Sequence, residues 1–95
     1  MLEIKKGSKS FYLGDSEENP LAEMVFSRTD ENTITIESTM VSEELGGQGV
    51  GKLILKDLVD WARKENKKII PVCPYAKAQM EKNEGYHDIM VTFNA

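Results

Sequence analysis

Hydrophobic residues recur at every second position along two consecutive stretches in the first half of the chain. They are Ala22, Met24 and Phe26 in the first stretch and Ile34, Ile36 and Met40 in the second. Side chains alternate between the two faces of a strand, so this spacing predicts two strands that each have one apolar face. The polar turn at residues 30–32 predicts that they pair antiparallel. The other face of the second strand is expected to meet solvent or a covering helix, because it carries Thr33, Thr35, Glu37, Thr39 and Val41.

A shorter pair of strands is expected before these two. Leu2 and Ile4 alternate with polar neighbours, a Gly7-Ser8 turn follows, and residues 10–13 are rich in aromatic side chains. This succession predicts a short hairpin. Residues 15–20 are polar and acidic, and we expect them to form a loop.

The hydrophobic period becomes helical after residue 49. A stripe at helical spacing consists of Val50, Ile54, Leu58 and Ala62, with Leu55 and Trp61 beside it, and opposite lie Lys52, Lys56, Asp60, Arg63 and Lys67. This arrangement predicts one long amphipathic helix, with Trp61 in the core. Cations favour the negative end of a helix dipole, so the helix is expected to end near residues 63–68.

The last third of the chain predicts three short elements. The apolar run at residues 69–73 predicts a buried strand. Pro71 has no N–H for a central ladder, so it must face an edge, a bulge or a gap between strands. A short helix is expected over residues 75–82, ending near Gly85, and a further strand over residues 89–93.

Four glycines stand within six residues just before the long helix, in the segment Gly46-Gly47-Gln48-Gly49-Val50-Gly51. The first N–H groups of a helix have no intrahelical partner, and glycines let a ligand approach the backbone closely. A glycine-rich loop before a helix therefore favours a phosphate site over a simple turn.

Two common phosphate motifs do not fit this segment. Leu53 stands where a Walker loop needs Ser or Thr for magnesium, and the chain is short for the parallel sheet of such enzymes. The spacing of Gly47, Gly49 and Gly51 departs from the dinucleotide pattern G-x-G-x-x-G, and the preceding strand belongs to an antiparallel pair.

The segment instead resembles the acetyl-coenzyme A loop of the GNAT N-acetyltransferase superfamily, whose pattern is Arg or Gln, two residues, Gly, one residue, and Gly or Ala. Gly46 departs from the first position of that pattern. The resemblance extends over about residues 20–90 and includes the strand end Ile69-Ile70-Pro71-Val72-Cys73-Pro74-Tyr75. The chain is similar to a GNAT subfamily whose members have about a hundred residues and a Cys-Pro-Tyr strand end.

The resemblance implies an α/β (α+β) fold with a mainly antiparallel sheet, splayed central strands, one long and one short helix, and a shortened N-terminal region. It implies acetyl-CoA as the cofactor, held by the backbone of Met40 and Val41, by the glycine loop and by the end of the strand over 69–73. The implied cofactor residues are Met40, Val41, Gly46, Gly47, Gln48, Gly49, Val50, Gly51, Lys52, Cys73, Pro74, Tyr75 and Lys77. No metal is expected.

Acetyl transfer to an amine needs a base for the amine and an acid for the leaving thiolate. Glu37 and Thr39 lie on the strand that faces this region, and Glu37 is either a base or an exposed strand glutamate. Cys73 either accepts the acetyl group or lines the pocket as a small apolar side chain. His87 is expected at the surface, and the tyrosine that GNAT enzymes usually carry on the short helix has no clear counterpart.

Composition agrees with one soluble domain spanning residues 1–95, with 40% hydrophobic and 29% charged residues. The charge is uneven, since residues 1–49 hold 4 basic and 10 acidic side chains and residues 50–95 hold 8 and 6. This balance argues against a nucleic-acid binder. The single Cys73 excludes an internal disulfide and a cysteine-based zinc cluster, and no run is long enough to span a membrane.

We therefore expect a cytoplasmic, monomeric or weakly dimeric protein that binds acetyl-CoA. The activity expected from the resemblance is N-acetyl transfer to an unidentified amine, for which a shortened N-terminal region would leave an open acceptor groove. The alternatives are an acyl-CoA-binding module without catalysis and an acetyl transfer that passes through Cys73.

Overall fold

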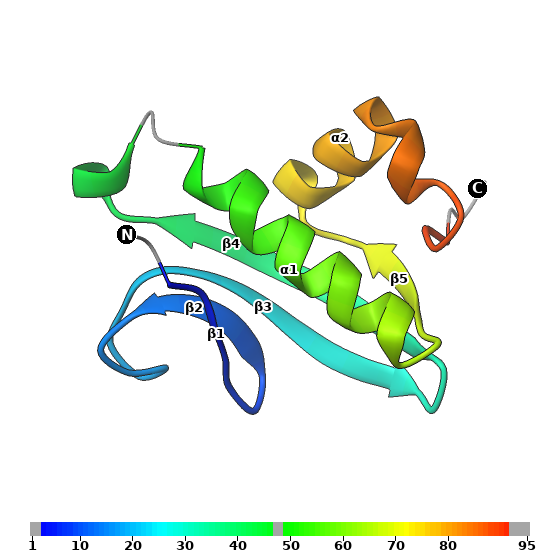
Figure 1. Ribbon diagram of the computed structural model, residues 1–95, viewed down its shortest axis with the longest axis horizontal. Coiled ribbons are helices and arrows are strands. Elements are labelled where there is room, and N and C mark those ends of the chain that lie inside the picture. The colour runs from blue at the N-terminus through cyan, green and yellow to red at the C-terminus, as the bar shows by residue number, and fades with distance from the viewer. Residues whose placement is uncertain (1–2, 47–48, 92–95) are drawn as a thin grey trace.

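The computed structural model describes residues 3–46 and 49–91 of the chain. Figure 1 shows its elements, which form a twisted sheet crossed by one long helix. In chain order they are β1 (Lys5–Lys6), β2 (Ser10–Gly14), β3 (Pro20–Asp30), β4 (Thr33–Val41), the 3₁₀-helix η1 (Glu43–Leu45), α1 (Val50–Lys64), β5 (Lys68–Pro71), α2 (Pro74–Lys82) and the 3₁₀-helix η2 (Glu84–Tyr86).

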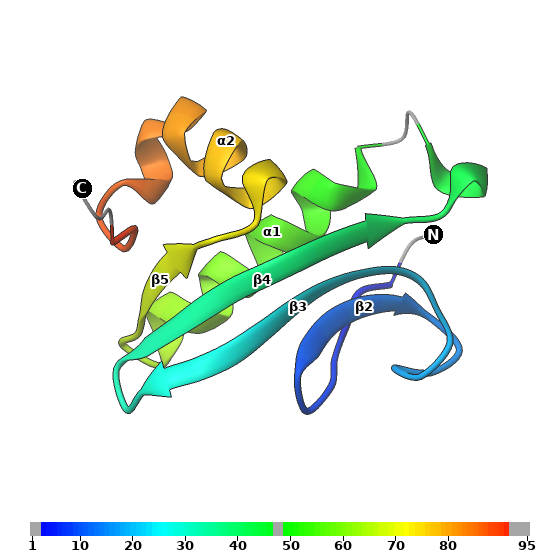
Figure 2. The ribbon, with the colours of Figure 1, turned by 180° about the vertical axis from the view of Figure 1, so that it is seen from behind.

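The strands lie side by side in their chain order, β1-β2-β3-β4-β5. The first four pair antiparallel, whereas β5 pairs parallel to β4. The difference follows from the connections. Short turns and loops join each of the first four strands to the next, whereas α1 connects β4 to β5. In Figure 1 α1 lies across the front of the sheet, and in the reverse view of Figure 2 strands β2 to β4 lie in front of α1. The mainly antiparallel α/β fold is confirmed.

The apolar stripe of α1 is buried against the sheet, as its spacing predicts. Val50, Ile54, Leu58 and Ala62 are at most 2% exposed. They belong to one core with the inward side chains of β3 and β4, which are Ala22, Met24, Phe26, Ile34 and Ile36. Full burial of one such aliphatic side chain contributes about 1.5–3 kcal/mol. Contact between α1 and these strands is therefore a main source of stability.

Trp61 lies at the edge of the core, where it joins α1 to the N-terminal hairpin. Its ring centroid is 5.7 Å from that of Phe11 in β2 and 5.4 Å from that of Phe26 in β3. The Lys6 ammonium lies over the Trp61 ring, 5.0 Å from its centroid, and covers that side of the ring. The hairpin expected from Leu2 to Leu13 is confirmed over its described residues.

A β-bulge in β4 overturns the expected side-chain alternation of that strand. Phe26 pairs with Ile36 and Val25 pairs with Ser38, so Glu37 is an extra residue between two consecutive pairs. A one-residue insertion exchanges the two faces beyond it. Thr39 therefore shares the inner face with Ile36, and Met40, which is 39% exposed, lies on the outer face. The prediction that Met40 belongs to the apolar face is wrong for this reason.

The helix α1 ends at Lys64, within the range that its run of cations predicts. Asn66 adopts the left-handed conformation with φ 58°, which ends a helix and which Asn tolerates. Its N–H donates to Arg63 C=O at 3.1 Å, and Lys67 N–H donates to Ala62 C=O at 2.8 Å. These two bonds satisfy carbonyls of the last turn, so the helix ends at Lys64 and Lys68 already belongs to β5.

Two further expectations concern the C-terminal segment. Helix α2 is confirmed over almost the expected range. Within the described residues, the expected strand at 89–93 is reduced to one bridge between Met90 and Ile69, and residues 92–95 lie outside the described part. None of the helices in residues 3–46 and 49–91 is long and apolar enough to cross a bilayer.

Candidate cofactor and acyl-transfer site

The central feature of the site is the point where β4 and β5 part. The two strands pair from Thr33 opposite Lys68 to Ile36 opposite Pro71. The N–H groups of Val72 and Cys73 then both donate to the C=O of Ile36, at 3.1 and 3.0 Å. Two consecutive donors on one carbonyl mark the end of the ladder. Over the described residues β4 continues to Val41 beyond that point, whereas the chain after β5 turns into α2.

Pro71 fits this place because its missing N–H faces away from β4. Lys68 N–H donates to Asn32 C=O and Val72 N–H donates to Ile36 C=O. Backbone groups of alternate residues point to opposite sides of a strand, so those of residue 71 point outward. The position is therefore an edge, one of the three placements that the sequence leaves open for this proline.

The bulge directs two backbone positions of β4 towards the gap. Ser42 N–H donates to Leu21 C=O at 2.8 Å, so the backbone groups of residues 40 and 42 point towards β3. By the same alternation those of Thr39 and Val41 point to the side that β5 has left. Met40, expected with Val41 to present backbone groups to a ligand, is paired with Glu23 instead.

The start of α1 faces the same region with uncapped backbone groups. Gly49 is the N-cap in the left-handed conformation, with φ 69°, and no side chain among the described residues caps the helix there. The first described bond back to this turn runs from Leu53 N–H to Gly49 C=O. The N–H groups of Val50, Gly51 and Lys52 are thus available to an anion. Gly47 and Gln48, also expected at the cofactor, lie outside the described residues.

A groove of about 360 Å³ joins the free edge of β4 to this helix start. Its lining residues are Thr39, Val41, Leu45, Gly46, Gly49, Val50, Gly51 and Tyr75. Tyr75 forms one wall, and a Cβ atom placed on Gly51 would lie 2.6 Å from the Tyr75 Oη atom. The groove therefore depends on glycine at position 51.

Cys73 lies beside the groove and contacts Thr39, which lines it. Its Sγ atom is 3.3 Å from the Thr39 Oγ1 atom, and the residue is only 4% exposed. It is the N-cap of α2, where Pro74 occupies the first helical turn. Burial raises the pKa of the Tyr75 phenol, and the nearby Cys73 raises it further. The phenol is therefore protonated at neutral pH and can donate a hydrogen bond.

The other expected site residues lie further from this groove or at its rim. Glu37 is exposed at the bulge, and Lys52 and Lys77 are exposed on α1 and α2. His87 also lies at the surface, with its Nε2 atom 3.0 Å from the Glu81 carbonyl oxygen. Within the described residues, His, Cys, Asp and Glu side chains form no group of three that could hold a metal ion.

A second hollow, of about 570 Å³, lies between α1 and the segment formed by α2 and η2, and sequence reasoning did not find it. Its lining residues are Lys52, Leu55, Gln79, Lys82, Asn83, Glu84, Gly85 and Tyr86. The hollow exists only where η2 folds back towards α1. The one sequence signal for that fold-back is the Asn-x-Gly turn at residues 83–85.

Comparison with known proteins shows the family to which the chain belongs. The model of the GCN5-related N-acetyl-transferase family matches residues 10–89. The solution structure, determined by NMR, of a GCN5-like protein from Staphylococcus aureus is 49% identical in sequence and superimposes with a TM-score of 0.82. That match covers 98% of this chain and 91% of the other. Among curated proteins, none matches the chain at a significant level. The chain therefore belongs to the GCN5-related N-acetyltransferase family.

Proposed function

We propose that residues 1–95 form one acetyl-CoA-dependent N-acetyltransferase domain that acts on an amine. The observation that carries the proposal is the groove between the free edge of β4 and the uncapped start of α1. An extended polar chain can pair with the backbone of Thr39 and Val41 as an added strand does. An anionic group at one end of that chain matches the N–H groups of Val50 and Gly51.

The residues that would hold the cofactor divide by chemistry. The glycine loop would take the pyrophosphate, with the Lys52 ammonium close by, and Thr39 and Val41 would take the pantetheine amides. Gly46 contributes no side chain where family members carry Arg or Gln, so the backbone cradle would provide that part of the binding. When bound, acetyl-CoA supplies an acetyl group activated as a thioester.

This chain's own residues supply two proton-handling groups near the groove. Tyr75 lines it and holds its proton at neutral pH, so it can protonate a leaving thiolate. Glu37 lies two residues before Thr39, at the bulge, and is exposed to a solvent-borne amine. It would serve as the base, directly or through water. Sequence reasoning placed Tyr75 at the cofactor but not in this role.

Cys73 supports a second candidate, in which the acetyl group passes through the protein. Its thiol is close to the groove, 3.3 Å from the Thr39 Oγ1 atom, at the N-cap of α2. The new bond would join the acetyl carbon to Sγ, the thioester bond to coenzyme A would break, and the thiol proton would go to the leaving sulfur. A third candidate is binding of acyl-CoA without catalysis.

One experiment separates these candidates. Purified protein is titrated with acetyl-CoA while the backbone amide signals are followed by NMR, and the mixture is then analysed by mass spectrometry with and without an amine panel. Shifts at Thr39, Val41 and Val50 to Lys52 are expected, followed by thiol release that depends on the amine and survives in Cys73→Ala. Thiol release measured with Lys56→Ala, a change at an exposed residue of α1 that does not line the groove, serves as the matched control.

Each alternative has its own result. An adduct of about 42 Da that is lost in Cys73→Ala would establish transfer through the thiol. Shifts without thiol release from any amine would leave a binding module. Absence of shifts at millimolar acetyl-CoA, about −4 kcal/mol or weaker, would overturn all three. We also retain a cytoplasmic location and a monomer or weak dimer as predictions, to be checked by fractionation and by sedimentation.

A further inference from the structure

Within residues 3–46 and 49–91, no helix covers the outer face of strands β2 to β4, the face opposite α1. Helices α1 and α2 both bury side chains in the core on the inner face. In Figure 2 strands β2 to β4 lie in front of α1, and no helix lies in front of these strands. Leu21 and Met40 are each 39% exposed. An uncovered sheet face with large apolar side chains is typical of an interaction surface.

Glu23 lies at the centre of this outer face with apolar side chains around it. The strand register places it beside Tyr12 of β2 and Met40 of β4. Alternation along β3 places Leu21 and Val25 on the same face. Side chains directly opposite each other on neighbouring strands have Cβ atoms about 5 Å apart. The Glu23 carboxylate, which belongs to a half-buried residue, is therefore flanked by apolar groups on four sides.

The carboxylates of this face have no cationic partner in the part of the chain that the structure describes. Neither Glu23 nor Glu18 forms an ion pair there. A hollow of about 440 Å³ beside Glu23 is lined by Lys9, Glu17, Glu18, Pro20, Glu23 and Val25. These side chains include three carboxylates and one ammonium. The hollow is therefore negatively charged.

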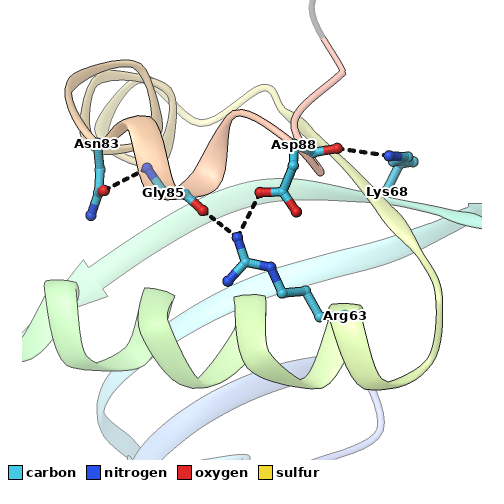
Figure 3. Close-up of polar contacts among 5 residues, drawn as sticks. All are labelled: Arg63, Lys68, Asn83, Gly85 and Asp88. Carbon is cyan, nitrogen blue, oxygen red and sulfur yellow. Dashed lines mark hydrogen bonds and ion pairs between the residues drawn. The ribbon is translucent and has the colours of Figure 1, made fainter.

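On the helix side, a cluster of charged side chains is already paired within the protein, as Figure 3 shows. The Arg63 guanidinium on α1 donates to the Gly85 carbonyl oxygen and pairs with the Asp88 carboxylate at 2.6 Å. The Lys68 ammonium at the start of β5 donates to the Asp88 carbonyl oxygen at 2.7 Å. These contacts tie η2 to α1 and β5. The carboxylates of the outer face, in contrast, remain available to a partner.

A partner that covers this face must bring positive charge. Covering the apolar side chains would remove the Glu23 carboxylate from water, and burying a carboxylate without a counter-ion is costly. Lys and Arg suit this position, because their apolar stems can lie along Tyr12 and Met40 while the charged end reaches the carboxylate. A second copy of this chain does not suit it. A two-fold interface would place the same negative surface against itself.

We propose that the outer face of β2 to β4 docks a protein segment in which Lys or Arg residues stand between apolar side chains. One cation pairs with Glu23 and another lies in the hollow, and the apolar side chains of the segment cover Leu21 and Met40. The groove at the start of α1 lies on the inner face of the sheet. The proposal therefore goes beyond the proposed function and does not depend on acetyl-CoA.

The test titrates the protein, without acetyl-CoA, with a short fluorescein-labelled peptide in which lysines and leucines are separated by glycines. Fluorescence anisotropy is expected to show saturable binding that weakens as salt is raised. Backbone amide shifts are expected at Glu23 and Val25. A matched peptide with glutamate in place of lysine should not bind. Glu23→Gln should weaken binding about threefold through loss of one exposed ion pair, and Met40→Ser about threefold through loss of apolar contact.

Two control variants match these changes in type but lie on α1 and its end. Glu65→Gln removes an exposed glutamate, and Leu53→Ser removes a leucine that is 43% exposed. Both should leave the affinity for the peptide unchanged. Equal losses in the controls, equal binding of the glutamate peptide, or no binding of the lysine peptide would overturn the proposal.

Two further results would assign the surface or the binding differently. Amide shifts confined to Thr39, Val41 and the start of α1 would place the peptide in the groove and overturn the proposal. Dimerisation of the free protein, measured by sedimentation and lost in Met40→Ser, would show that a second copy occupies the face instead. Because acetyl-CoA is absent from these measurements, neither result decides the proposed function.

Discussion

Gly51 and Tyr75 meet across the start of the groove, although 24 positions separate them in the chain: a Cβ atom at position 51 would lie 2.6 Å from Tyr75 Oη and 2.8 Å from Cζ. Gly51 is the second residue of the helix that follows β4, and Tyr75 is the second residue of the helix that follows β5. The absence of a side chain at Gly51 thus sets how closely the two helix starts approach.

This contact predicts how Gly51→Ala behaves. Alanine should favour the first turn of α1 by about 0.5 kcal/mol, but it must also displace the Tyr75 ring. We expect urea unfolding to show little net change in the wild-type background and a gain in a Tyr75→Ala background. Acetyl-CoA affinity should fall about tenfold or more in the single variant, because the methyl group narrows the groove. Equal effects of Gly51→Ala in both backgrounds would contradict the contact.

Gly49 makes a different prediction, because its constraint is backbone conformation. No atom of the described residues lies within 4 Å of a Cβ atom placed there, yet its φ is +69°. Alanine at this position should therefore cost about 1–2 kcal/mol of unfolding free energy through strain alone. Gly49→Asn should cost less, since Asn tolerates this conformation. Gly46→Ala is the control, because Gly46 has φ −59°. If Gly49→Ala lowers the free energy of unfolding no more than Gly46→Ala does, the assignment of strain at Gly49 is wrong.

The Glu17 carboxylate links the loop after β2 to the turn of the N-terminal hairpin. It accepts from Ser8 N–H, Ser8 Oγ, Lys9 N–H and Ser10 Oγ, at 3.2, 3.1, 3.0 and 2.9 Å. The Lys9 backbone bond, followed by the Ser10 hydroxyl, lowers the pKa of Glu17 to about 2 from 4.5. The sequence predicts only a polar, acidic loop over this segment.

The lowered pKa predicts the sign of a pH effect. The bonds favour the ionised form in the folded protein, so their stabilisation is complete above pH 4.5 and is lost as the pH falls towards 2. Urea midpoints measured across this window should fall less steeply in Glu17→Gln than in wild-type protein. Glu18→Gln, a neighbouring change that leaves the four bonds in place, should follow wild type. A Glu17→Gln profile parallel to wild type would be the contrary result.

The Arg63–Asp88 pair predicts a local effect rather than a global one. Both side chains are substantially exposed, so the pair is screened by salt and contributes little to overall unfolding. Its hydrogen bond lowers the pKa of Asp88 and raises that of Arg63. Asp88→Asn should speed amide exchange at Tyr86 and His87 about twofold or more, with α1 amides unchanged. Equal amide exchange rates at Tyr86 and His87 in the wild type and in Asp88→Asn would show that the pair does not hold η2.

The sequence was sufficient to predict elements whose period runs over many residues. The stripe from Val50 to Ala62 and the alternation from Ala22 to Phe26 predict burial correctly, because each is repeated and locally consistent. The parting of β4 and β5 was available only through the family resemblance. Pro71 indicated an edge, a bulge or a gap but could not decide among them.

The remaining features depend on contacts between distant parts of the chain. Thr39 meets Cys73, 34 positions away, and Arg63 meets Asp88, 25 positions away. Neither contact produces a periodic pattern in the sequence from which it could be predicted. The end of α1 at Lys64 lies in the range that the cations predict, and the left-handed conformation of Asn66 explains why the helix stops there.

The bulge at Glu37 divides β4 into two parts with different roles. Up to Ile36, the inward side chains are committed to the core and a change there must respect packing. From Thr39 onward, the same face borders the groove and carries little of the folding energy, since Thr39 and Val41 are incompletely buried. If the proposed function is correct, substitutions at these two positions alter acyl or cofactor preference without endangering the fold. The distal half of β4 is then the natural place to redesign donor specificity in this scaffold.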